Sequence, residues 1–326
     1  MNLALVLFLV TIFPFVLTVF LLRWMLQSRL MKIAIDLPNH RSLHTVPVPR
    51  TGGVAVMVAT LSSWVLIWQP WSMTLVVCTL LLMALSLVDD VRGLAAGWRF
   101  VGHFVVAGVF MGLALPSVSI WAMVALAVAI VWMTNLFNFM DGADGLAGGM
   151  ALFGFAAYAI ASWLAGSDQL ALICMAIVAS ATAFLLYNFH PARVFMGDAG
   201  SIPLGFLAAV IGLLGWQSGV WALWFPVMVF SPFIVDATIT LIKRLLRGEK
   251  IWQAHRSHFY QRLVLMGWGH RTTAIAEYIL MVLVGSSAVL LIGQSLLMQW
   301  LGLGCWLLVY ASLLLMVDRM WKKTVQ

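Results

Sequence analysis

Long apolar stretches alternate along this chain with short polar gaps, and this pattern predicts a bundle of membrane-spanning helices. We count eleven apolar segments, at about residues 3–22, 52–69, 73–88, 100–115, 119–137, 146–165, 169–187, 201–217, 220–242, 274–293 and 296–317. Several approach the roughly 20 residues that a helix needs to cross a bilayer. A membrane barrel would instead need alternating segments of about ten residues. The predicted fold is an all-α polytopic integral membrane protein, with residues 1–326 forming one domain.

The charged residues occupy only every second gap between these segments. All 18 Lys and Arg residues, with eight of the 11 acids, lie in or beside the gaps 23–51, 89–99, 138–145, 188–200 and 243–273 and the tail 318–326. The remaining gaps hold one charge, Asp168. Because basic loops stay on the cytoplasmic side, we predict an outside N-terminus and a cytoplasmic C-terminus. The polar machinery would then face the cytoplasm.

Composition supports this class and narrows the partners. The chain is 63% hydrophobic and 9% charged, whereas soluble domains are about 25% charged. Its formal net charge of +7 favours anionic partners such as lipid head groups, nucleotides or sugar phosphates. We expect no nucleic-acid partner. The three cysteines lie in apolar runs, so no disulfide framework is implied.

Two adjacent acids, Asp89 and Asp90, end the third apolar segment. Neighbouring residues on a helix point about 100° apart, so the two carboxylates cannot play one identical role. Their repulsion raises at least one pKa unless a cation compensates. We interpret the pair as a metal ligand or general base, against the simpler reading that the ends of spans carry charges.

A second polar group recurs every three residues at the end of the fifth segment: Asn135, Asn138, Asp141 and Asp144. Consecutive members could share a ligand on a helix surface, and four polar groups at a membrane edge are costly without a function. The glycines at 142, 145, 148 and 149 could admit a diphosphate close to the backbone. Alternatively, they form a helix-packing face.

The gap 188–200 holds a third set of candidates. Asp198, between two glycines, has room for a hard cation such as Mg²⁺, which takes one or two carboxylates and keeps several waters. Asn188 offers an amide to a base or sugar, and Arg193 could pair with phosphate. Phe195 could stack on a base or serve as an interfacial anchor.

The loop 243–273 contains two histidines three residues apart, His255 and His258, which one helical face could present together. A zinc site needs three or four ligands, so we predict phosphate or sugar contacts instead. The alternative is an ordinary basic loop. Asp236, four residues after Pro232, is expected to face the protein interior without an assigned role.

These motifs together resemble the polyprenyl-phosphate N-acetylhexosamine-1-phosphate transferases of glycosyltransferase family 4. The resemblance runs in order from about Asp36 to Arg271. It covers Asp36-Leu37-Pro38-Asn39, Pro49-Arg50-Thr51-Gly52-Gly53, Asp89-Asp90, the Asn138-to-Gly145 block, the Asn188-to-Ser201 block and the final histidine loop.

The resemblance implies transfer of a sugar 1-phosphate from a UDP-N-acetyl amino sugar to undecaprenyl phosphate, with Mg²⁺ (or Mn²⁺) required and UMP released. The implied roles are as follows: catalytic, Asp89 and Asp90; metal, Asp198 and Asp90; substrate-binding, Asn138, Asp141, Asp144, Asn188, Arg193, Phe195, His255 and His258. A homodimer is compatible with the sequence.

The final loop departs from one branch of the family. The muramoyl translocases carry three consecutive histidines there, whereas this chain has His255-Arg256-Ser257-His258. That argues against a muramoyl-pentapeptide donor and favours an N-acetylhexosamine or a 6-deoxy relative, at the start of O-antigen or related polysaccharide synthesis. The alternatives were a CDP-alcohol phosphotransferase, whose later aspartates are missing, and a lipid or solute transporter, which would favour midplane sites and internal repeats.

Overall fold

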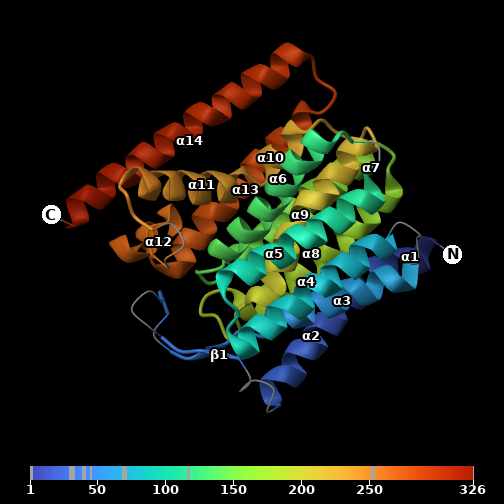
Figure 1. Cartoon of the computed structure of the whole chain (residues 1–326), viewed down its shortest axis with the longest axis horizontal. Coiled ribbons are helices and arrows are strands. Elements are labelled where there is room, and N and C mark those ends of the chain that lie inside the picture. Colours follow the sequence, from blue (N-terminus) through green and yellow to red (C-terminus); the bar gives the residue numbers. More distant parts are fainter. Residues whose placement is uncertain are drawn as a thin grey trace.

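The computed structural model confirms the predicted all-α membrane class. It describes residues 3–28, 34–38, 42–44, 46–67, 72–115, 118–250, 253 and 255–325. Within those ranges, nine helices are long and apolar enough to cross a membrane, and a tenth apolar helix, Gly52–Ile67, is shorter. Most of the helices run side by side, and α1 and the far end of α14 lie at opposite ends of the bundle (Figure 1).

Each predicted apolar segment is largely helical over the residues that the structure describes. The helices are α1 (Leu3–Val10), α2 (Ile12–Gln27), α3 (Gly52–Ile67), α4 (Ser72–Arg92), α5 (Ala96–Ala114), α6 (Ile120–Phe139), α7 (Leu146–Leu164), α8 (Asp168–Asn188), α9 (Asp198–Gln217), α10 (Trp224–Val229), α11 (Ser231–Leu246), α12 (Phe259–Leu263), α13 (Gly269–Leu291) and α14 (Leu296–Val325), with a π-helical turn, Val264–Trp268, before α13.

The ninth predicted segment is two helices. α10 ends at Val229 and α11 begins at Ser231, with Pro232 in the first turn of α11. Proline has no N–H to continue the preceding hydrogen-bond ladder, but it fits a first helical turn. A segment broken in this way is not one continuous span, and eleven crossings therefore stay a prediction.

The middle of the chain forms the core, and the last helix lies at the margin. Of the most apolar 18-residue stretch of each helix, 83% is buried in α9 and 11% in α14. α14 diverges from the other helices along much of its length (Figure 1). Among the candidate spans of the described chain, α9 is therefore the most buried.

A short hairpin precedes α3. β1 (Ile35–Asp36) pairs antiparallel with β2 (Val48–Pro49). The chain after β2 then pairs with the segment before α9: Phe195 donates its N–H to the Pro49 carbonyl at 2.8 Å, and Gly53 donates to the Met196 carbonyl at 2.8 Å. A Cβ at Gly53 would collide with the backbone of Gly200. Glycine is therefore required where the first turns of α3 and α9 touch.

The last turns of α4, α6 and α8 and the first turns of α5, α7 and α9 lie at one end of the bundle, together with the hairpin. We call this the charged end. Asp168 begins α8 at the opposite end.

Candidate active site

The adjacent acids Asp89 and Asp90 have different surroundings. Asp89 accepts hydrogen bonds at 2.7 Å from the Leu94 N–H and from the Arg99 guanidinium. The Asp90 side chain is only 8% exposed, and it forms a longer ion pair with the Arg50 guanidinium, at 4.0 Å. Within the described chain, Asp90 accepts no hydrogen bond comparable to those of Asp89. The expected division of roles is therefore visible: Asp89 is held in place, whereas Asp90 keeps its oxygens available.

Asn138, Asp141 and Asp198 meet where α6 ends and α9 begins. The Ser201 hydroxyl on α9 donates to the Asn138 side-chain oxygen at 3.0 Å, and the Asn138 side chain lies near Asp198. The Gly197 N–H lies near the Asp141 carboxylate. The row of polar residues does not continue along one helix, because α6 ends at Phe139 and Asp141 lies in the following turn.

Two arginines face these acids. Arg99 on α5 lies 2.7 Å from Asp89 and 3.6 Å from Asp198. Arg50 follows β2, and its backbone N–H donates to the Ala34 carbonyl at 2.8 Å. Four carboxylates therefore face two guanidiniums, which leaves an excess of negative charge. We define the acid cluster as Asp89, Asp90, Asp141 and Asp198.

The chemistry of the acid cluster suits a hard divalent cation. Its donors are carboxylate oxygens, which Mg²⁺ and Mn²⁺ favour, and its charge excess would be compensated by one divalent ion. Within the described ranges, no three His, Cys, Asp or Glu side chains converge as a ready-made metal cage. Mg²⁺ needs no such cage, since it usually takes one or two carboxylates and completes its shell with water and phosphate. The residues present thus fit the predicted ion.

Asp141 shows the electrostatic cost of this arrangement. Burial, followed by the nearby Asp198 carboxylate, holds the pKa of Asp141 well above its usual range. Desolvation and like charge both disfavour the ionised form. A bound cation would reverse both effects.

Asp144 and Asn188 are occupied by the protein itself. Asp144 is buried and contacts the rings of His190 at 2.7 Å and His270 at 3.5 Å, besides accepting from the Ala192 N–H at 3.1 Å. The Asn188 amide accepts from the Gly145 N–H at 3.0 Å and donates to the Val194 carbonyl at 2.9 Å. Both side chains position the loops at the charged end, and any contact with substrate would use their remaining lone pairs.

The glycines beside these acids serve packing. A Cβ at Gly142 would collide with the Tyr260 hydroxyl, and one at Gly149 with the Tyr278 ring. Gly145 adopts a φ of 79°, a left-handed conformation at the start of α7 that favours glycine. These contacts support the packing reading, and close approach of a diphosphate to the same glycines stays a prediction.

Arg193 and Phe195 lie on the segment before α9. The exposed Arg193 lies over the Tyr187 ring, 4.7 Å from its centroid, and donates to the Leu186 carbonyl at 3.1 Å. The Phe195 ring meets the His44 ring edge-on at 5.0 Å. The roles predicted for these two residues in binding phosphate and base stay predictions.

His255 and His258 come together without sharing a helix. Their ring centroids are 4.8 Å apart, but His255 lies in the loop and His258 is the N-cap of α12. Ser257 donates its N–H to the His255 Nδ1. Burial lowers the pKa of His255 to about 4, with help from His258 and Arg244. His255 is therefore neutral at physiological pH.

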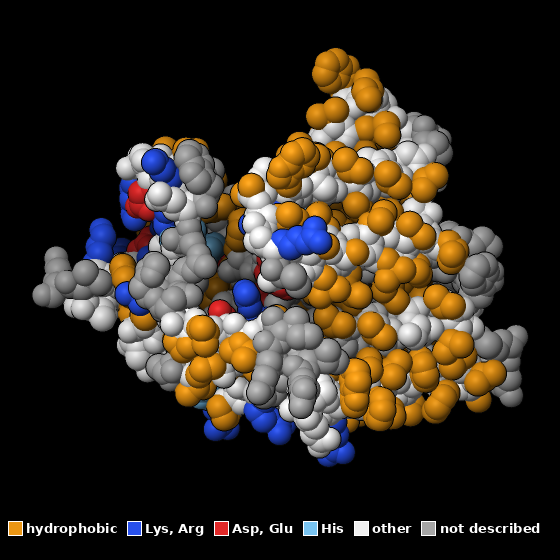
Figure 2. Space-filling view, turned by 60° about the horizontal axis from the view of Figure 1, so that its bottom comes forward, with side chains coloured by type: hydrophobic (Ala, Val, Ile, Leu, Met, Phe, Trp, Pro, Cys, Tyr) orange, Lys and Arg blue, Asp and Glu red, His pale blue; other side chains and the backbone are white. Residues whose placement is uncertain are grey.

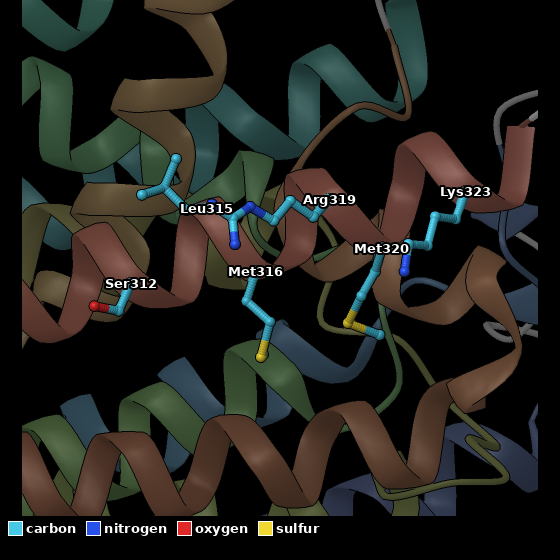
Figure 3. A pocket seen from close by; sticks show the side chains of 6 residues that line it. All are labelled: Ser312, Leu315, Met316, Arg319, Met320 and Lys323. Carbon is cyan, nitrogen blue, oxygen red and sulfur yellow. The ribbon is translucent and has the colours of Figure 1, made fainter.

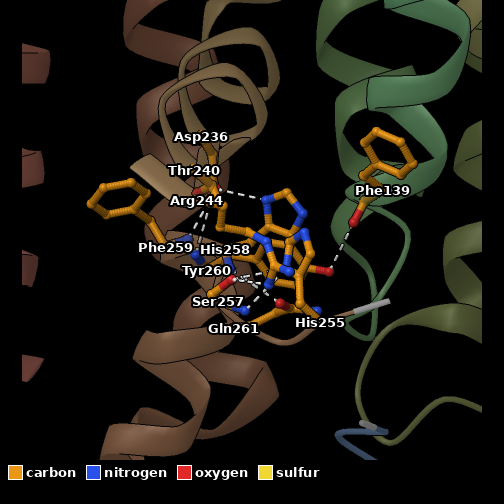
Figure 4. Close-up of polar contacts among 10 residues, drawn as sticks. All are labelled: Phe139, Asp236, Thr240, Arg244, His255, Ser257, His258, Phe259, Tyr260 and Gln261. Atoms are coloured by element: carbon orange, nitrogen blue, oxygen red, sulfur yellow. Dashed lines mark hydrogen bonds and ion pairs between the residues drawn. The ribbon is translucent and has the colours of Figure 1, made fainter. Parts of the chain in front are cut away.

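Asp236 holds this histidine loop, as Figure 4 shows. Its buried carboxylate accepts from the His258 ring at 3.1 Å and from the N–H groups of Phe259 and Tyr260 at 2.9 Å each. Asp236 was expected to face the interior, and it does. Its function is to anchor the first turn of α12 on α11.

Sequence reasoning named no site role for Arg50, Arg99 or Asp236. Arg50 was quoted only as part of a motif and Arg99 was only a charge in a predicted loop, and their pairing with particular acids depends on tertiary packing. Figure 2 shows a hollow in one face of the molecule, in which acidic, basic and histidine side chains are visible. The fold and the site together define an integral membrane protein with an acidic site at one end of its helix bundle.

Comparisons with known proteins identify the family. A model described as glycosyl transferase family 4 matches residues 72–216. The chain is 30% identical to a probable undecaprenyl-phosphate N-acetylglucosaminyl 1-phosphate transferase of Bacillus subtilis (strain 168), over 83% of this chain and 80% of that protein. It is 28% identical to the undecaprenyl-phosphate alpha-N-acetylglucosaminyl 1-phosphate transferase of Escherichia coli O157:H7, over 88% and 84% of the two chains. A phospho-N-acetylmuramoyl-pentapeptide-transferase of Geobacillus thermodenitrificans is 28% identical, over 68% and 76%.

The chain therefore belongs to glycosyl transferase family 4, and the family predicted from its motifs is confirmed. It is a membrane transferase.

Proposed function

We propose that this protein transfers N-acetylhexosamine 1-phosphate from a UDP-sugar to undecaprenyl phosphate, giving undecaprenyl-diphospho-sugar and UMP. The observation that carries the proposal is the acid cluster at one end of an apolar helix bundle, faced by Arg50 and Arg99. A lipid phosphate can reach such a site while its tail stays in the bilayer. The relatives named for N-acetylglucosaminyl phosphate transfer support an N-acetylhexosamine as the sugar.

The proposed chemistry divides among the residues at the charged end. Asp198, with Asp90, would hold Mg²⁺, which when bound neutralises phosphate charge and polarises the diphosphate. Asp90 is the better placed of the two adjacent acids to accept the proton of the lipid phosphate, because its oxygens are not engaged as those of Asp89 are. Arg99 pairs with Asp89 and approaches Asp198, so it fixes the positions of these two carboxylates relative to each other. His255, His258 and the Asn138–Asp144 segment would contact the donor.

The proposed orientation places the charged end in the cytoplasm of a bacterial inner membrane, where nucleotide sugars are made. The one-sided distribution of Lys and Arg supports it. Synthesis of O-antigen or a related surface polysaccharide would then begin at this face.

The proposed reaction is tested with purified protein, undecaprenyl phosphate and separate UDP-sugars. We expect Mg²⁺-dependent UMP release with UDP-N-acetylhexosamines, together with a lipid product heavier by one sugar phosphate in mass spectrometry. UDP-glucose, which lacks the acetamido group, is the matched control donor and should release far less UMP. Uptake of substrate into proteoliposomes without UMP release would instead indicate a transporter.

The requirement for Mg²⁺ should depend on pH through Asp141. Asp141 lies near the proposed Mg²⁺ ligand Asp198, and its raised pKa means that a proton removes this nearby negative charge at a higher pH than at an ordinary aspartate. Below that pKa, the Mg²⁺ concentration for half-maximal activity should rise as pH falls, by up to about tenfold per pH unit for one competing proton. Asp141→Asn removes this titratable carboxyl group and should flatten the dependence on pH. An equally steep dependence in that variant would assign the titration to another group.

A further inference from the structure

Five basic side chains meet on the side of α11 and α12 that faces α14. They surround a cavity of about 90 Å³, lined by Thr240, Lys243, Arg244, Arg247, Arg256, Ser257, Arg262 and Trp321. Among the described residues, no acid lines this cavity. We call it the basic pocket. Its volume is several times what one water needs.

The acids near the basic pocket do not neutralise it. Asp318 on α14 pairs with Lys243 and with Arg262, the latter at 2.7 Å. Glu249 lies 3.3 Å from Arg244 and 3.8 Å from Arg247. Within the described ranges, Arg256 has no carboxylate within ion-pair distance. Five cations against two carboxylates leave an excess of about three positive charges, the reverse of the acid cluster.

Two of these arginines also carry unused donors. Arg244 and Arg262 are each only 8% exposed, and the Nε of each is buried without a hydrogen-bond partner among the described residues. A buried donor without an acceptor is costly. Arg262 is fixed over the Phe259 ring, 4.0 Å from its centroid, so it cannot simply swing into solvent. An anion in the basic pocket would lie beside both guanidinium groups and offset this cost with new charge-assisted hydrogen bonds.

The basic pocket is separate from the candidate active site. α12 turns one side to α6, where the Tyr260 hydroxyl donates to the Phe139 carbonyl at 3.1 Å. Its other side, with Phe259 and Leu263, packs on Val317 of α14. Figure 4 shows His255 and His258 toward Phe139, and Phe259 pointing away from it. A ligand in the basic pocket would therefore lie behind the histidine loop, away from the acid cluster.

We propose that the basic pocket binds the phosphate group of an anionic ligand and so joins α14 to α11 and α12. Phosphate matches the planar donors of arginine, and basic pockets between helices at a membrane edge bind anionic lipid head groups. A separate groove of about 360 Å³, lined by Ser312, Leu315, Met316, Arg319, Met320 and Lys323, runs along the opposite face of α14 and shares no residue with the basic pocket (Figure 3). The same chemistry could come from free phosphate, and the experiment separates the two sources.

The test uses the full chain purified in detergent and titrated with dihexanoyl phosphatidylglycerol, dihexanoyl phosphatidylcholine or sodium phosphate. Binding is read by native mass spectrometry and by the shift in Tm. We expect phosphatidylglycerol to bind the unmodified protein and to bind the double variant Arg247→Gln/Arg256→Gln at least about tenfold more weakly, since each cation near such a head group contributes about 1 kcal/mol. Both arginines are exposed, so the substitutions spare the core.

The matched control, Arg23→Gln/Arg271→Gln, removes the same charge at two exposed positions outside the pocket. It should keep the affinity within about twofold, because general attraction between charges at a distance is screened. Displacement of the lipid by sodium phosphate would show that free phosphate suffices, whereas binding of phosphatidylglycerol alone would assign a lipid head group.

No binding of either anion, or equal weakening in both double variants, would overturn the proposal. Asp198→Asn should bind phosphatidylglycerol as the unmodified protein does. Lipid binding in the basic pocket is therefore measured independently of transferase activity, and failure of the transferase assay would not count against the pocket.

Discussion

Asp198→Asn is expected to lower kcat for sugar-phosphate transfer by about 10³-fold while the protein stays folded. Asparagine keeps the shape of the side chain but removes the charge that would hold a cation at the diphosphate. Loss of one element of transition-state charge stabilisation typically costs 10²–10³-fold, and here the metal would be lost with it. The measurement is initial UMP release at saturating Mg²⁺, with Tm recorded for the same preparations.

Asp168→Asn is the matched control for this substitution. It makes the same chemical change in the first turn of a helix, but on an exposed residue at the opposite end of the bundle. We expect activity within about twofold of the unmodified protein, as for surface substitutions away from special features. Normal turnover by Asp198→Asn, with unchanged dependence on Mg²⁺, would show that Asp198 does not hold the cation.

Asp236→Ala should release the histidine loop from α11 and abolish most of the activity without touching the acid cluster. The change leaves the N–H groups of Phe259 and Tyr260 buried without an acceptor and removes the partner of His258. Each orphaned donor costs about 1–3 kcal/mol, so a destabilisation of this segment by about 3–5 kcal/mol is expected. Hydrogen exchange followed by mass spectrometry should show faster exchange over residues 255–263.

Two further variants separate anchoring from general loss of charge. Asp236→Asn keeps one acceptor oxygen and should give an intermediate exchange rate. Glu249→Gln removes a carboxylate from the same region, where it is more exposed, and should leave exchange over residues 255–263 unchanged. Protection of that segment in Asp236→Ala equal to the unmodified protein would refute the anchoring role.

The periodic features of the site could be predicted from the sequence because they follow from local rules. Apolar runs of sufficient length must form helices in a bilayer, where every backbone polar group needs an internal partner. Asp89, Asp90 and Asp198 end or begin such runs, so their place near a membrane edge followed directly. Asp141 is close enough to the end of α6 to share that edge.

The division of work among polar residues was not predictable in this way. Asp144 and Asn188 resemble Asp141 and Asn138 in the sequence, yet their hydrogen bonds run mainly to loops and backbone groups of the protein. His258 resembles His255, but it is the buried N-cap of α12 and bonds to Asp236. Each of these outcomes depends on which segment packs opposite, and spacing along one segment contains no such information.

The break at Phe230 shows the same limit for the helices. Hydropathy treats residues 220–242 as one apolar run, and Pro232 indicates only a bend. In the structure the run becomes α10 and α11, and the change of direction brings Asp236 to the first turn of α12.

By itself, the amino-acid order determined the membrane class, the gathering of charge into alternate gaps and the family, since hydrophobic length and short motifs are local properties that each segment carries alone. Tertiary packing decided which acids stay available and which are bound, how Arg50 and Arg99 balance the acid cluster, and where five cations meet behind the histidine loop. Such features arise from contacts between segments that are far apart in the sequence, as in the hydrogen bonds Asp144–His270 and Tyr260–Phe139, which join residues 126 and 121 positions apart. Burial and Coulomb energy depend on distance in space, which the order of residues does not state.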